Sequence, residues 1–237
     1  MPDLAPTIDG MFFALAQSSF ANARDATSAP GGVNTSSTRY SAAVRYIRSS
    51  GRGGGTVHGI TRSIFEFDTS GISVTPSDAT LKLFGFLGQT ADLFVVKGNT
   101  ATDGALVPSD YEPLGWTTGA DNSSNVTKYS SEITSWSTSG YNDITLNSTA
   151  LSDMVSLDSF TVCLIESVHD LRNVAPTANT FKNGMYFQNQ DGTSYDPYID
   201  YTLAVTGYGN SVMGIASGDI ANINGIATAD ISKVNGV

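Results

Sequence analysis

The sequence offers few side chains for nucleophilic or metal chemistry. There are only two histidines, His58 and His169, so a site with three histidine ligands cannot form within one chain. Cys163, with His169 and Asp170 a few residues later, supplies the residue types of a nucleophile, a base and an orienting acid. Cys163 nevertheless lies in an apolar run, residues 160–165, where cysteine usually acts as a small core residue. We therefore expect neither a catalytic site nor enzyme activity.

Paired carboxylates are equally scarce. A glycosidase needs two carboxylates that flank the sugar bond, and the only glutamates are Glu66, Glu112, Glu132 and Glu166. Glu66 and Glu166 lie on expected strands, where positions on the outer face of a sheet account for them. The glycine-rich segment at 51–55 lacks the closing G-K-[ST] of a phosphate loop, so it is interpreted as a flexible turn.

Aspartates gather in two polar turns, residues 68–71 and 191–196. Carboxylate oxygens are the ligands that calcium prefers, although aspartate is also a common turn former. Asp191 and Asp196 are therefore the candidate ligands of a structural calcium ion. No other cofactor is expected.

Aromatic side chains are the clearest candidates for ligand binding. Six of them fall in connections rich in Ser, Thr, Asn and Gly, and the richest of these segments, residues 117–140, is the expected recognition surface. Aromatic ring faces cover the apolar faces of sugars, while neighbouring polar groups orient the hydroxyls. Individual rings could instead anchor a loop to the edge of a sheet. The candidate sugar-binding residues are Tyr111, Trp116, Tyr129, Trp136, Tyr141 and Tyr195.

Composition narrows the class of protein. Charged residues make up 14% of the chain, and 22 acidic against 12 basic residues give a net charge of −10, which disfavours nucleic-acid binding. Hydrophobic residues (40%) suffice for a core, while abundant Ser, Thr, Gly and aromatic residues favour β-structure with many turns. No apolar run is long enough to span a membrane. The first ten residues carry two acids and no base, so no secretory signal is expected.

The middle of the chain, residues 31–206, reads as a series of strands. Apolar residues alternate with polar ones, and Gly, Pro, Asn and Asp separate the runs. This pattern predicts an all-β fold, a two-sheet antiparallel jelly-roll sandwich, preceded by an N-terminal arm at residues 1–30. The expected strands are 42–47, 62–68, 79–86, 91–97, 143–146, 160–165, 184–188 and 198–205.

The last segment, residues 207–237, contains an internal repeat. Residues 215–225 and 226–236 match at most positions, with a period of eleven. An acid near the start and Asn-Gly at the end of each copy favour one turn of helix, a glycine stop and a short extended step. So short a helix is unstable alone in water, so the tail is expected to bind a partner surface; a low-complexity tail is the alternative. The candidate assembly residues are Ile215, Ile220, Ile223, Ile226, Ile231 and Val234.

Two resemblances add to this interpretation. The run R-S-I-F-E-F-D at 62–68, followed by A-T-L-K-L at 79–83, resembles the signature of DNRLRE-type β-sandwich domains. Residues 141–151, 160–166 and 196–202 are similar to further strands of that family. The resemblance covers roughly residues 40–206. It implies a jelly-roll fold and a non-catalytic module of cell-surface, secreted or virion proteins, some of which bind polysaccharide. The repeat resembles the tails of bacteriophage structural proteins.

These features predict a non-enzymatic virion surface or structural protein. Capsid decoration, head-fibre and tail-fibre components all fit, with terminal segments that anchor the protein to other copies of itself and to virion proteins. Host-surface polysaccharide would be a further ligand. The alternative is a carbohydrate-binding module or adhesin domain of a bacterial surface or secreted protein.

Overall fold

The chain divides into two compact units, Met1–Thr202 and Leu203–Val237. The computed structural model describes residues 3–50, 55–89, 91–99, 104–177, 179–187, 195–204, 222–223 and 226–227. The described elements, in chain order, are β1 (Asp3–Leu4), β2 (Pro6–Gln17), α1 (Phe20–Arg24), β3 (Val33–Asn34), β4 (Arg39–Ser50), β5 (Thr56–Asp68), β6 (Pro76–Gln89), β7 (Leu93–Lys97), η1 (Pro108–Tyr111), β8 (Tyr141–Thr145), α2 (Ser148–Ser156), β9 (Ser159–Glu166), η2 (Ser167–Leu171), β10 (Asn179–Tyr186), β11 (Tyr198–Leu203), β12 (Asn222–Ile223) and β13 (Ile226–Ala227).

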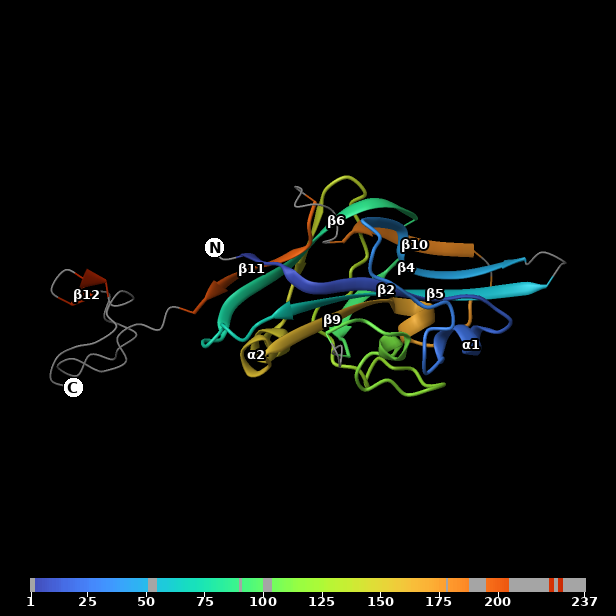
Figure 1. Cartoon of the computed structure of the whole chain (residues 1–237), viewed down its shortest axis with the longest axis horizontal. Helices are drawn as coiled ribbons and strands as arrows, with labels where there is room; N and C mark the ends of the chain where they lie inside the picture. Colours follow the sequence, from blue (N-terminus) through green and yellow to red (C-terminus); the bar gives the residue numbers. More distant parts are fainter. Residues whose placement is uncertain are drawn as a thin grey trace. The chain divides into compact units, whose positions relative to one another are not determined.

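The first unit is mostly β, with one large antiparallel sheet and a few short helices (Figure 1). Among the described residues the sheet has 11 strands, ordered β1-β11-β6-β10-β4-β5-β2-β3, while β8 pairs with β6, β9 with β5 and β7 with β9. This architecture confirms the all-β expectation at the level of a β-rich fold.

Two long strands change partners along their length. One edge of β5 pairs with β2, while the other pairs with β4 over residues 56–61 and with β9 over residues 63–68. Strand β6 pairs with β8 over residues 80–84 and with β10 at Gly85, Gly88 and Gln89. The sheet therefore branches at the middle of β5, and the two branches can cover a common core.

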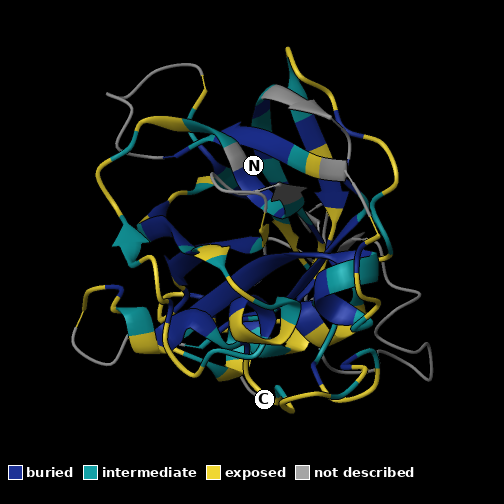
Figure 2. Ribbon diagram, turned by 90° about the vertical axis from the view of Figure 1, so that its right-hand side faces the viewer, coloured by how far each residue is buried: buried dark blue, intermediate teal, exposed yellow. Residues whose placement is uncertain are grey.

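The core consists of two clusters that share β5. Phe65 and Phe67 belong to the larger cluster, whereas Ile60 and Ile64 belong to the smaller one. Because successive side chains of a strand point to opposite faces, β5 is buried on both sides, and Figure 2 shows the buried strands gathered in the interior. Burial on both faces explains why its central positions carry so few exposed polar side chains.

All eight strands expected from the alternation are present, as β4 to β11. The expected N-terminal arm needs correction, because β2 pairs with β5 over its whole length. Pro6 lies opposite Phe67 at one end of the pairing, and Gln17 lies opposite His58 at the other. Met11 packs in one cluster and Phe12 in the other. Their adjacent burial removes the alternation that would have marked a strand.

The helices of the first unit were not expected from the sequence. Helix α2 is capped by Asn147, whose side chain accepts hydrogen bonds from the N–H groups of Thr149 and Ala150. Its buried face is small, consisting of Ala150 and Met154, which leaves little helical periodicity to read. None of the described helices is long and apolar enough to cross a membrane.

Two short strands are described near the end of the second unit. Strands β12 and β13 pair antiparallel, with Ile223 opposite Ile226. The expected helical turn is therefore wrong at residues 222–223, which are extended and pair with residues 226–227. The other expected assembly residues, Ile215, Ile220, Ile231 and Val234, lie outside the described residues.

Candidate functional site

A cluster of aromatic side chains occupies the outer face of β6, β8, β10 and β11. On β6, Leu81 and Leu83 are fully buried, whereas the alternate residues Phe84 and Phe86 are partly exposed. The same alternation makes Tyr186 on β10 partly exposed between two buried neighbours. We call the following six residues the aromatic patch: Phe84, Phe86, Tyr141, Tyr186, Tyr195 and Tyr198.

Phe84 lies at the centre of the patch. Its ring centroid is 5.2 Å from that of Tyr141, 5.6 Å from that of Tyr186 and 4.4 Å from that of Tyr195. Tyr141 is directly opposite Phe84 in the β6–β8 register. Such ring pairs contribute about 0.5–1.5 kcal/mol each beyond the area that they bury, so the patch holds its own geometry.

The patch extends in both directions from Phe84. Towards β11, the Tyr198 ring lies 5.5 Å from that of Tyr141. Towards β4, Phe86 lies 5.7 Å from Tyr186, and the Arg39 guanidinium sits 4.3 Å from the centre of the Phe86 ring. Tyr195 completes the contacts, 4.9 Å from Tyr186.

Polar groups border the rings. The Lys82 ammonium lies 2.9 Å from the Asp143 carboxylate, and this hydrogen bond raises the pKa of Lys82 above its ordinary value. The Tyr141 hydroxyl donates to the carbonyl oxygen of Asp196 at 3.0 Å. Burial, with Tyr198 and Asp196 nearby, raises the pKa of Tyr141 to about 12, so its hydroxyl keeps its proton at neutral pH. The patch therefore combines ring faces with fixed hydrogen-bonding groups.

Close backbone packing beneath the patch fixes β6 in place. A Cβ atom added at Gly85 would lie 1.6 Å from the carbonyl oxygen of Ser137, so only glycine fits between Phe84 and Phe86. The Trp136 indole N–H donates to the carbonyl oxygen of Gly184 at 3.1 Å, which ties the same loop to β10.

Of the six predicted sugar-binding residues, the structure brings two together. Tyr141 and Tyr195 both contact Phe84. The expectation of exposed loop aromatics needs correction for Tyr111, Tyr129 and Trp136, which are buried. They anchor their loops: the Tyr129 hydroxyl, for example, donates to the Asp153 carboxylate at 2.6 Å.

Trp116 lies in a buried charged network rather than at the patch. The Arg62 guanidinium sits between the rings of Tyr111 and Trp116, at 4.1 and 4.3 Å from their centres. Arg62 also donates two hydrogen bonds to the Asp170 carboxylate, at 2.8 and 2.6 Å. Arg24 lies over the same Trp116 ring at 4.5 Å. These groups join β5, α1 and η2 to the loop that contains Trp116.

Of the residues considered for nucleophilic chemistry, Cys163 is buried and the others bind partners of their own. Cys163 is fully buried, and burial raises the pKa of its thiol to about 12. The Asp170 carboxylate is bonded to Arg62, while the His169 ring contacts the carbonyl oxygen of Val174 through Nδ1 at 2.5 Å. The Glu166 carboxylate accepts hydrogen bonds from the N–H groups of residues 168, 169 and 170.

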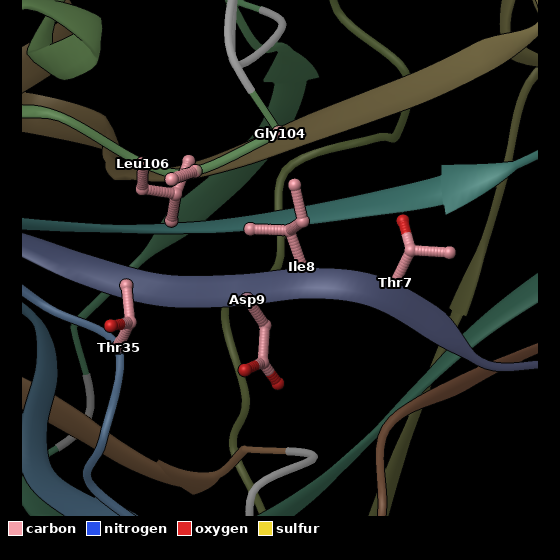
Figure 3. Close-up of a pocket in the computed structure, with 7 residues that line it drawn as sticks. Thr7, Ile8, Asp9, Thr35, Gly104 and Leu106 are labelled. Carbon is pink, nitrogen blue, oxygen red and sulfur yellow. The ribbon is translucent and has the colours of Figure 1, made fainter.

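Two cavities lie away from the aromatic patch. One of about 270 Å³ is lined by Thr7, Ile8 and Asp9 of β2 together with Thr35 and residues 104–106 (Figure 3). Figure 3 shows Ile8 directed to the side of Leu106 and Asp9 to the opposite side of the strand. Another, of about 170 Å³, lies between Tyr46, Phe181 and His169.

Only one of the two predicted calcium ligands lies in the described part of the chain. Asp196 lies just before β11, and Asp191 lies outside the described residues. In the part of the chain that the structure describes, no three His, Cys, Asp or Glu side chains gather as a metal site would require. The aromatic patch is therefore the site on which a functional argument can be built.

The prediction of sugar-binding residues considered only aromatic residues in loops. It therefore missed Phe84, Phe86, Tyr186 and Tyr198. The signal that could have found them is the alternation itself. In Leu81-Lys82-Leu83-Phe84, Lys82 marks the solvent face of β6, and Phe84 has the same parity. Several large aromatic residues gathered at solvent-facing positions of neighbouring strands indicate a binding surface.

The patch can bind the apolar faces of a ligand and orient its hydroxyl groups, but it presents no activated nucleophile among the described side chains. Four of the six rings belong to tyrosine, whereas Leu81 and Leu83 of β6 point into the core. The chain matches no family model and no curated protein sequence.

Proposed function

We propose that this chain is a non-enzymatic polysaccharide-binding module, and that the aromatic patch is its binding surface. The carrying observation is that six partly exposed aromatic side chains contact one another on one face of the sheet. Sugars combine apolar ring faces with hydroxyls, and this surface combines ring faces with phenolic hydroxyls, a carboxylate and a guanidinium.

We infer a two-sheet jelly-roll sandwich as the finer architecture of the first unit. The change of partners along β5 and β6 supports this inference, since each strand would then contribute to both layers. The larger core cluster, which includes Leu81, Leu83, Phe65 and Phe67, would fill the space between the layers. In that arrangement the patch lies on the solvent face of one layer.

The test is binding of the full chain to a panel of neutral and charged polysaccharides, measured by affinity electrophoresis and calorimetry. Tyr195→Ala and Tyr186→Ala should each weaken binding by about tenfold, which is the order expected for the loss of one ring contact. Phe181→Ala is the matched control, because Phe181 is as exposed (39%) as Tyr195 (38%) and lies on β10 outside the patch. Failure to bind any polysaccharide, or equal loss in the control, would contradict the proposal.

A virion surface protein is the second candidate. The eleven-residue repeat favours it, since the repeat belongs to a unit separate from the one that carries the patch. In that role the second unit would hold copies together or attach them to a particle, and the patch would face host polysaccharide. Truncation after Tyr208 should then abolish self-association or attachment without unfolding the first unit.

A further inference from the structure

We propose that the polysaccharide is acidic and that Arg39 binds its carboxylate or sulfate groups at the β4 end of the aromatic patch. This inference rests on the proposed function and adds the charge class of the ligand to it.

The position of Arg39 suits recognition of an anion beside a stacked sugar. Arg39 lies opposite Tyr186 in the β4–β10 register, and its Nη1 donates to the Tyr186 hydroxyl at 3.1 Å. Its guanidinium also lies 4.3 Å from the centre of the Phe86 ring. Stacking and this single hydrogen bond orient the planar group, while its other N–H donors have no acceptor among the described residues. Those donors match the two oxygens of a carboxylate.

Lys82, the other cation of the patch, is already neutralised. It pairs with Asp143 at 2.9 Å, and Asp200 lies close enough to contribute to its raised pKa. Five ion pairs connect the described residues, and Arg39 belongs to none of them. Arg39 is therefore the cation of the patch whose charge is available to a ligand.

The strand that carries Arg39 creates a local positive field in an acidic protein. Strand β4 contains three arginines, Arg39, Arg45 and Arg48, and no Asp or Glu, although the whole chain has a net charge of −10. Strand β10 also lacks acidic residues, and its Lys182 lies opposite Arg45 of β4. At the other end of the patch are Asp143 and Asp200. This asymmetry predicts that the anionic groups of a bound chain lie towards β4.

The experiment compares polysaccharides that differ only in charge. Full-length protein is titrated with polygalacturonate and with the same polymer after complete methyl esterification, and in parallel with dextran sulfate and with dextran. We expect the charged member of at least one pair to bind at least tenfold more tightly, with affinity that falls as salt is added because the contact is electrostatic. The two pairs distinguish a carboxylate from a sulfate ligand.

Variants then locate the contact. Arg39→Gln should weaken binding of the charged polymer by about tenfold, which corresponds to ~1.4 kcal/mol, and should thereby remove most of the preference for the charged over the neutral polymer. Arg39→Lys should lose part of the affinity, because lysine keeps the charge without the planar fork. Arg48→Gln is the matched control: it removes the same charge from the same strand, at a residue that donates to the Thr177 carbonyl instead of the patch.

The outcomes separate this inference from the proposed function. Equal or tighter binding of the neutral polymers would overturn the inference while the polysaccharide-binding function stands. Loss of charged-polymer binding to the same degree in Arg39→Gln and Arg48→Gln would also overturn it, because the effect would then be one of net charge. Failure of the whole panel, neutral and charged, would remove the proposed function and the inference together.

Discussion

Arg62 and Asp170 form an ion pair that is completely removed from solvent. Both side chains have zero exposure, and the guanidinium donates to both carboxylate oxygens, to the carbonyl oxygen of Tyr111 and to that of Arg24. A buried charge left without its partner typically costs about 3–5 kcal/mol. Asp170→Asn should therefore lower the free energy of unfolding by that amount in urea denaturation.

The exposed pair on β6 and β8 supplies the contrast. Lys82→Met removes an ion pair whose Asp143 side chain is 60% exposed, and such pairs contribute about 0–1 kcal/mol. Similar losses of stability in Lys82→Met and Asp170→Asn would show that burial does not set the cost of breaking these pairs.

Glu166 makes stability depend on pH in a direction opposite to most carboxylates. Burial raises the pKa of Glu166 to about 7 from an ordinary value of 4.5, even though three backbone N–H groups favour its ionised form. Because the folded pKa is the higher one, the folded state takes up a proton more readily. The resulting stability is fully present below about pH 4.5 and is lost as the pH rises through about 7.

The expected size of this effect is about 3 kcal/mol, at 1.36 kcal/mol per pKa unit. We expect Glu166→Gln to flatten the decline in unfolding free energy between pH 5 and pH 8, measured in urea at several pH values. Asp78→Asn, an exposed change on β6, serves as the control. A decline of unchanged steepness in Glu166→Gln would assign the pH dependence to other groups.

Single residues show most clearly how much of the candidate site could be predicted from the sequence. Tyr141 and Tyr195 were predictable because aromatic residues in polar loops stand out. Tyr111 and Tyr129 belong to the same class by sequence, yet both are fully buried. The difference arises from tertiary contacts, since their loops fold over the sheet and use the rings as anchors. No local signal separates an anchoring ring from a binding one.

Among the elements, strands with one buried face were predictable and those with two were not. Strand β6 alternates cleanly, with Leu81 and Leu83 inward and Lys82 outward. Strand β2 has successive buried residues, Met11 and Phe12, that pack in different clusters. Its sequence therefore resembles any short apolar run. The branching of the sheet at β5 is likewise a matter of long-range pairing that periodicity does not encode.

Gly85 links the integrity of β6 to that of the patch. A methyl group there would collide with the Ser137 carbonyl, and strand β6 would have to move away from the loop. We expect Gly85→Ala to lower the unfolding free energy by about 1–3 kcal/mol, the range of overpacking in a filled interior, and to weaken polysaccharide binding because both neighbours belong to the patch.

The control for Gly85→Ala is Gly71→Ala. A Cβ at Gly71 would meet no atom within 4 Å, so the same chemical change should leave stability and binding nearly unaltered. Urea denaturation and calorimetric titration of both variants give the comparison. Retention of wild-type stability and binding in Gly85→Ala would indicate that the loop can retreat from β6 without disturbing the patch.

For the whole molecule, the division into two units places the proposed binding surface and the proposed assembly segment in different parts of the chain. The patch and both core clusters lie within the first unit, whereas the repeat lies within the second. Each proposed role thus has its own part of the chain. A polysaccharide presents many equivalent sites, so copies held together by the second unit would bind it with far higher avidity than a single copy.

Truncation after Tyr208 tests this division of roles. Because the first unit ends at Thr202, the shortened protein should keep its unfolding midpoint within a few degrees and its affinity for a short oligosaccharide, measured by calorimetry. Its apparent affinity for the long polymer should fall by about 100-fold, because simultaneous attachment of several copies is lost. Light scattering of both proteins measures the accompanying change in mass. An unchanged mass with unchanged polymer binding would exclude the second unit from assembly, whereas a collapsed midpoint would mean that it completes the fold of the first.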